Sequence, residues 1–215
     1  MADKLERTRA TKIFTILKEL YPKVHTALEN WDGIEWKFLF CVILSAQTTD
    51  VQVNRVTKRL FGEYPSLESF ASSSTEDIST MIRSIGFYNV KAKYLKKTAT
   101  LLINEYGGVV PKVNEELMKL PGVGRKVANV FTGVICKENQ GIAVDTHVMR
   151  LSRRLGLTKQ SNPIIIEKDL QKLYPNKVNW DEISLLLIEH GRKTCTARRP
   201  KCDMCELESI CPKLI

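Results

Sequence analysis

Four cysteines near the end of the chain are the feature that most constrains its fold. They follow the spacing C-x6-C-x2-C-x5-C, as Cys195, Cys202, Cys205 and Cys211. Four soft ligands this close together suit either a 4Fe-4S cluster or a structural zinc ion. Zinc ribbons usually have two short C-x2-C pairs, whereas this chain has one such pair flanked by single cysteines, which favours the cluster. Either metal centre would lock the C-terminal tail onto the rest of the protein.

The remaining sequence reads as helical almost throughout. Apolar residues recur at steps of three and four, and the segment 36–44 is apolar on all sides, so we expect it to run through the core. Ser73 stands three residues before Glu76 as in a capping box, Pro163 suits a first helical turn, and Gly156 suits a left-handed stop. No sustained alternation of period two predicts strands. We therefore predict an all-α fold, with helices around 13–20, 36–44, 49–61, 75–83, 88–102, 115–120, 125–135, 146–155, 163–174 and 181–191.

Composition restricts the partners. The chain has 33 Lys and Arg against 24 Asp and Glu, a net charge of +9, which favours a polyanion, although a solvated lysine-rich surface would give the same charge. It has no apolar run near the ~20 residues that a membrane span needs. The first six residues carry acidic groups and no apolar segment, which argues against a signal or transit peptide. With reduced thiols as well, we expect an intracellular protein, in the cytoplasm or nucleoid of a prokaryote or in a nucleus.

A glycine-rich turn lies between two predicted helices, in the segment Leu120-Pro-Gly-Val-Gly-Arg-Lys126. Gly122 and Gly124 would let the backbone adopt positive φ and approach another molecule closely. The free N–H groups and positive end of the following helix would then bind a phosphate without regard to base sequence. An ordinary helical hairpin that uses glycine only for its geometry is the alternative.

Lys126 is the candidate nucleophile. It lies in the first turn of the predicted helix beside Arg125, where a further positive charge is disfavoured, and a neutral amine is what a Schiff-base-forming lysine requires. Nineteen residues later, Asp145 stands at the entry of the next helix as a candidate partner. The plainer roles are a surface lysine that touches phosphate and an N-cap aspartate.

Basic residues crowd the loop around the first cysteines, with no acidic residue from Arg192 to Lys201. We expect this loop to contact the phosphate backbone of a polyanion, because phosphate contacts by Lys and Arg supply most non-specific affinity for nucleic acids. The metal centre would act as a rigid support for the loop, since all four of its ligand positions are filled by cysteine and none is open for a water. The candidate contacts are Lys193, Arg198, Arg199 and Lys201.

Four motifs in order resemble one family, the endonuclease III branch of the helix-hairpin-helix DNA glycosylases. The resemblance rests on Leu44–Asp50, Leu120–Lys126, Val144–His147 and the cysteine tail. It implies a six-helix barrel domain over 28–138 that contains the hairpin, and a discontinuous cluster domain from 1–27 and 139–215. It also implies one 4Fe-4S cluster, and a monomer that binds double-stranded DNA in the cleft between the domains, with no membrane partner.

The resemblance also implies roles for single residues. Lys126 matches the catalytic lysine and Asp145 the catalytic aspartate. Gln47 matches the residue that fills the gap left by a flipped-out base. Ile85 and Phe87 match the wedge against the opposite strand, although many relatives have leucine in place of Phe87.

The implied activity is a DNA glycosylase with abasic-site lyase activity in base excision repair. It would act on DNA that carries a damaged base or an abasic site, and remove oxidised or ring-saturated pyrimidines such as thymine glycol. Two alternatives are a DNA-binding protein that senses redox state without catalysis, and a mismatch- or uracil-directed glycosylase. A lysine at position 126 argues against the thymine-mismatch branch, which usually has tyrosine there.

Overall fold

The computed structural model describes residues 2–136 and 139–214, and these form helices with no strand, as the sequence predicts. They divide into two compact units. The central unit is residues 27–135, and the terminal unit joins residues 1–26 to 136–215. Within the described part of the chain, no helix is long and apolar enough to cross a membrane.

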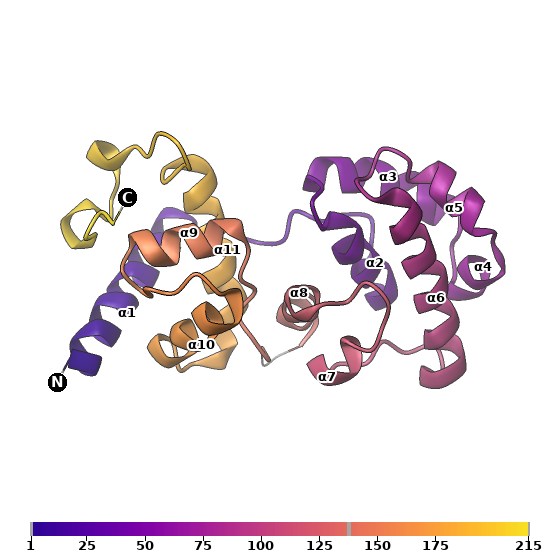
Figure 1. Ribbon diagram of the computed structural model, residues 1–215, viewed down its shortest axis with the longest axis horizontal. Coiled ribbons are helices and arrows are strands. Elements are labelled where there is room, and N and C mark those ends of the chain that lie inside the picture. Colours follow the sequence, from indigo (N-terminus) through magenta and orange to yellow (C-terminus); the bar gives the residue numbers. More distant parts are fainter. Residues whose placement is uncertain (1, 137–138, 215) are drawn as a thin grey trace. The chain divides into compact units, whose positions relative to one another are not determined.

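The central unit contains α2 to α8, which Figure 1 shows in violet to rose. The helix bounds are α2 Glu35–Ser45, α3 Asp50–Glu63, α4 Leu67–Ser72, α5 Thr75–Met81, α6 Tyr88–Tyr106, α7 Asn114–Leu117 and α8 Arg125–Ile135. The expectation for α2 is confirmed, because every residue from Lys37 to Leu44 is buried. Phe38 packs against the rings of Trp31 and Phe131, and a second aromatic cluster joins Trp36 to Phe70. The C-terminal end of α2 at Ser45 leads into the loop that carries Gln47.

The terminal unit joins the first helix to the second half of the chain. It contains α1 Ala2–Leu20, α9 Thr146–Arg154, α10 Pro163–Leu173 and α11 Trp180–Lys193, followed by short 3-10 turns at Cys202–Met204 and Glu208–Ile210. Helix α11 lies beside α9 and α1, as Figure 1 also shows. Ile13 and Leu17 from α1 share a core with Leu151 and Leu186, so the N-terminal helix completes a unit that is built mainly from residues more than 130 positions later.

Helix ends show where local signals were sufficient. Pro163 opens α10 after Asn162, whose side chain accepts a hydrogen bond from the amide of Ile164, and Gly156 has a φ of +63°. The capping box predicted at Ser73 is wrong by one residue, because Ser74 caps α5 by accepting a hydrogen bond from the amide of Asp77. Helix α4 was not predicted. It begins with a capping box between Ser66, its N-cap, and Ser69, a signal that the sequence analysis did not use.

Candidate functional site

The turn between α7 and α8 is held against α6. Gly122 has a φ of +79°, and a Cβ there would lie 2.6 Å from Cδ2 of Tyr94 and 3.2 Å from Cγ2 of Ile43. Thr98 donates a hydrogen bond of 3.2 Å to the carbonyl of Pro121, and Val123 is buried beneath the turn. Gly122 is therefore required twice, once for its backbone conformation and once for the close approach of the tyrosine ring.

Gly124 differs from Gly122. Its φ is not in the left-handed region, so the expectation of positive φ at both glycines is correct for Gly122 only. Its carbonyl accepts a hydrogen bond from the amide of Ala128, which makes Gly124 the residue that precedes α8. A Cβ at Gly124 would meet no protein atom within 4 Å. The protein itself does not need glycine here, whereas a phosphate that approaches the start of α8 would need the open backbone.

Lys126 is exposed in the first turn of α8. The helix buries the opposite face through Val127, Ala128 and Phe131, and Val127 directly follows Lys126. The amphipathic pattern of α8 therefore fixes the orientation of the lysine, because the buried residues can face the core only in one rotation of the helix.

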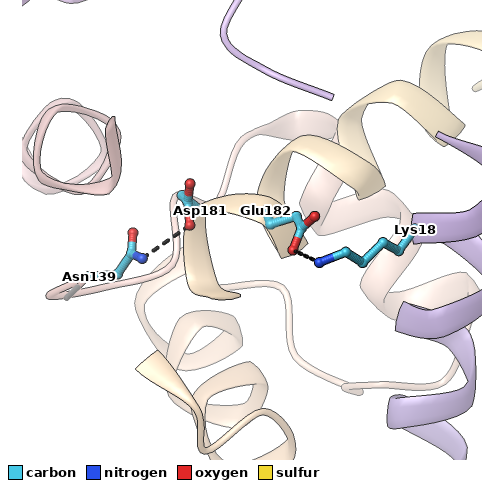
Figure 2. A network of polar contacts seen from close by, with 4 residues as sticks. All are labelled: Lys18, Asn139, Asp181 and Glu182. Carbon is cyan, nitrogen blue, oxygen red and sulfur yellow. Dashed lines mark hydrogen bonds and ion pairs between the residues drawn. The ribbon is translucent and has the colours of Figure 1, made fainter. Parts of the chain in front are cut away.

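Asp145 is the N-cap of α9, and its Oδ1 accepts a hydrogen bond of 2.8 Å from the amide of Val148. The segment before it is anchored to the start of α11, where Asn139 Nδ2 donates a 3.0 Å hydrogen bond to Asp181, as Figure 2 shows. Burial raises the pKa of Asp181. The neighbouring Glu182 pairs with Lys18 of α1 at 2.9 Å. Asp145 therefore does cap α9, as the plainer interpretation expects. The cap uses Oδ1, so Oδ2 can serve another function.

Two other predicted DNA contacts lie on loops of the central unit. Gln47 and Phe87 are exposed, and both have the left-handed backbone that is uncommon outside glycine, with φ of +55° and +57°. Ile85 is instead 2% exposed and belongs to the core, so its expected role as a wedge requires a correction. A side chain that packs inside the unit cannot also press against a DNA strand in this conformation.

The sequence reading missed Lys91, a buried lysine on α6. Its ammonium donates to the carbonyls of Leu44 and Ala46 at 2.8 and 2.6 Å, and burial lowers its pKa to about 8. No local signal marks it, because its two carbonyl partners lie more than forty positions earlier in the chain.

The four cysteines line one cavity at the end of the chain, and none forms a disulfide. Four cysteines around one cavity suit an iron–sulfur cluster, in which each thiolate binds one iron.

Hydrogen-bond donors approach the sulfur atoms, as expected around thiolates that bind a cluster. Arg154 Nη1 lies 3.5 Å from Cys195 Sγ, and the amide of Lys213 lies 3.3 Å from Cys211 Sγ. His190, which is buried, has its Nε2 at 3.4 Å from Cys205 Sγ. These contacts come from α9, α11 and the tail itself, so the cluster site ties three segments of the terminal unit together.

The basic loop is shaped by backbone contacts that leave its charges outside. Arg154 donates to the carbonyls of Thr196 and Ala197 at 2.7 and 2.8 Å, and the amide of Lys201 donates to the carbonyl of Thr194. The predicted contacts are all exposed, namely Lys193, Arg198, Arg199 and Lys201. Of these, Lys193 pairs with Glu189 at 2.7 Å, and its ammonium lies over the ring of Tyr21.

Comparisons with known proteins agree with this geometry. A family model described as HhH-GPD superfamily base excision DNA repair protein matches residues 40–176, and one described as the iron-sulfur binding domain of endonuclease III matches residues 195–211. Endonuclease III of Synechocystis is 44% identical and aligns over 96% of this chain and 93% of its own length. For endonuclease III of Bacillus subtilis the identity is 41%, and the covered shares are 90% and 87%.

Solved structures give the same result. One trapped endonuclease III–DNA covalent intermediate has a TM-score of 0.88 at 39% identity, and covers 96% of both chains. A thermostable thymine-DNA glycosylase, with a TM-score of 0.82 at 23% identity over 99% of this chain and 98% of its own, shares the fold. With its helical hairpin and its cysteine-lined cavity, the chain belongs to the endonuclease III family of helix-hairpin-helix base excision repair enzymes, bifunctional DNA glycosylases and abasic-site lyases with an iron–sulfur cluster.

Proposed function

We propose that this enzyme removes oxidised or ring-saturated pyrimidines, such as thymine glycol, from double-stranded DNA, with Lys126 as its nucleophile. The observation that carries the proposal is the position of Lys126, which is exposed in the first turn of α8 directly after an open glycine turn. A phosphate held at the start of α8 would bring the adjoining sugar to the same helical turn as the amine.

The reaction follows from an amine at that position. A base inside a duplex cannot be reached, so the nucleotide is first extruded, and a pyrimidine that has lost aromaticity stacks poorly and costs less to extract. The neutral Lys126 amine then attacks the anomeric carbon as the bond to the base breaks, and the base leaves with the electron pair and gains a proton. Ring opening gives a Schiff base, and loss of a proton from C2′ expels the 3′ phosphate by β-elimination.

Asp145 would provide the negative charge. Positive charge develops on the sugar as the base leaves, and a fixed carboxylate stabilises it without reorganisation. It can also accept the proton that Lys126 must lose. The N-cap hydrogen bond to Val148 holds the carboxylate in one orientation, which supports this role, since it uses Oδ1 alone. Lys126 and Asp145 belong to different units, so their pairing in the complex with DNA stays a prediction.

The remaining candidate residues would bind DNA. Gln47 would fill the gap left by the extruded base, and Phe87 would press against the opposite strand; its exposed fraction of 65% suits that role. Arg125 and the basic loop would contact phosphates. We infer four irons from the four thiols of the cavity, which would serve as the ligands. The cluster would supply rigidity to the basic loop.

We also infer that the enzyme works as a monomer, inside the cell, where its DNA substrate lies and thiols stay reduced. Its net charge of +9 suits double-stranded DNA with a damaged base or an abasic site as the partner.

A borohydride trapping assay on duplexes tests the proposal. The panel would carry thymine glycol, dihydrouracil, uracil, a G·T mismatch or an abasic site. Wild type should become covalently linked to the first two and to the abasic duplex. Lys126→Ala should lose trapping while its affinity for the abasic duplex stays within about tenfold, because phosphate contacts supply most of the affinity. Lys58→Ala, an exposed lysine on α3, is the matched control. Unchanged trapping by Lys126→Ala would remove the mechanism, and preference for uracil or G·T would remove the assigned lesion class.

A further inference from the structure

Lys91 is a buried cation on α6 that the proposed chemistry does not use. Its side chain is 5% exposed, yet its ammonium reaches three oxygens, the carbonyls of Leu44 and Ala46 and the hydroxyl of Thr48, at 2.8, 2.6 and 3.3 Å. An ammonium carries three donors, so this set of acceptors satisfies it fully. Burial of a charged group is costly unless the group is paired or hydrogen-bonded. A lysine at this buried position therefore depends on its three contacts.

The three acceptors surround the residue that we propose to enter the DNA. Leu44 lies at the end of α2, where carbonyls have no partner within the helix and a positive charge is favoured. Ala46 and Thr48 flank Gln47, whose backbone is left-handed with a φ of +55°. A residue other than glycine keeps such a conformation only when its surroundings impose it. Lys91 contacts both neighbours of this residue, through the backbone carbonyl of Ala46 and the side-chain hydroxyl of Thr48.

The same lysine is connected to the proposed wedge. Phe87 precedes Lys91 by one helical turn, and its carbonyl accepts a 3.0 Å hydrogen bond from the Lys91 amide. Phe87 is also left-handed, with a φ of +57°. The two loops lie close together, because a Cβ added to Gly86 would lie 3.5 Å from the Gln47 carbonyl oxygen and 3.9 Å from Thr48 Oγ1.

We propose that Lys91 is a positioning residue that holds Gln47 and Phe87 in place before DNA binds. The proposal rests on the proposed function, because it needs Gln47 and Phe87 to act on the duplex. A preformed pair would replace the extruded base and press on its partner strand without first ordering two loops, so the entropy of ordering would not oppose extrusion. Lys91 itself touches neither the substrate nor Lys126 in this role.

The role predicts which substrates depend on Lys91. Extrusion is needed for a damaged base in a duplex, and it is not needed for an abasic site in single-stranded DNA, where only the lysine chemistry remains. Lys91→Met, which keeps the length of the side chain and removes the charge, should lower excision of thymine glycol from a duplex by about tenfold or more. Borohydride trapping on single-stranded abasic DNA should change less than about twofold. Lys93→Met, an exposed lysine on the same helix, should affect neither assay.

A double-mutant cycle separates positioning from general support. If Lys91 acts through Gln47, Lys91→Met should add little to the loss caused by Gln47→Ala. Lys91→Arg, which keeps the charge, should restore part of the duplex activity. Thr48→Val, which removes one acceptor and keeps the volume, should give a smaller loss in the same direction, and it serves if Lys91→Met does not fold.

Equal losses on duplex and single-stranded substrates, or full additivity with Gln47→Ala, would overturn the inference. Wild type that excises no thymine glycol would instead contradict the proposed function, so the two failures are distinguishable.

Discussion

The two glycines of the hairpin should respond differently to the same substitution. Gly122→Ala places a Cβ 2.6 Å from Cδ2 and 3.1 Å from Cγ of Tyr94, in a backbone with a φ of +79°. The left-handed conformation costs a residue with a Cβ about 1–2 kcal/mol. Forcing the ring and Ile43 to move costs about 1–3 kcal/mol more, as overpacking does in other cores. Cγ of Tyr94 is one bond from its own Cβ, so rotation of the ring cannot relieve the contact. We expect a total loss of about 2–5 kcal/mol in the unfolding free energy of the central unit.

Gly124→Ala is the matched control. Its φ is not in the left-handed region, and its new Cβ would meet no protein atom within 4 Å. We expect a change of about 1 kcal/mol or less in stability, which is the usual range for alanine at the residue that precedes a helix. The methyl group would instead occupy the space through which a phosphate reaches the amides of α8. Affinity for an undamaged duplex should therefore fall several-fold.

Urea unfolding followed by tryptophan fluorescence measures both changes. Trp31 and Trp36 lie in the central unit and Trp180 in the terminal unit, so a Trp180→Phe background reports the central unit alone. Binding is measured by fluorescence anisotropy of a labelled duplex. Equal destabilisation by the two substitutions would refute the packing argument, and unchanged affinity of Gly124→Ala would refute the phosphate site.

Three further predictions concern the terminal unit. Asp145→Asn should keep the N-cap, because asparagine can also accept a hydrogen bond from the Val148 amide. Base excision should nevertheless fall by about a hundredfold or more, because the negative charge is lost. A melting temperature that drops in step with activity would favour a capping role alone. Arg198→Ala and Lys201→Ala should each weaken duplex binding and reduce the salt slope by about 1, and a changed lesion preference would contradict that role. Removal of iron with an oxidant and a chelator should lower the unfolding midpoint reported by Trp180. The midpoint reported by the tryptophans of the central unit should not change. Iron-free protein of equal stability would disprove the support role of the cluster.

Local signals were sufficient where the physics is local. The apolar periodicity predicts the long helices, and Pro163, Gly156 and the apolar segment in α2 behave as expected. The spacing of the four cysteines predicts a shared metal centre, and all four line one cavity. The position of Lys126 also follows from sequence, because a glycine turn and an amphipathic helix fix both its depth and its direction.

The sequence could not distinguish residues whose roles depend on distant neighbours. Ile85 and Phe87 are both apolar and two positions apart, yet one is in the core and the other is exposed. Gly122 and Gly124 look alike in the sequence, but only Gly122 has a left-handed backbone and lies against the ring of Tyr94. Lys91 reads as an ordinary surface lysine until the end of α2 is placed against α6. Helix periods, caps and cysteine spacing thus predict the fold class, the metal centre and the candidate nucleophile, because these predictions depend on nearby residues. Only the tertiary structure decided which loop residues face outward and which cation holds them, because burial is set by segments that meet from more than forty positions away.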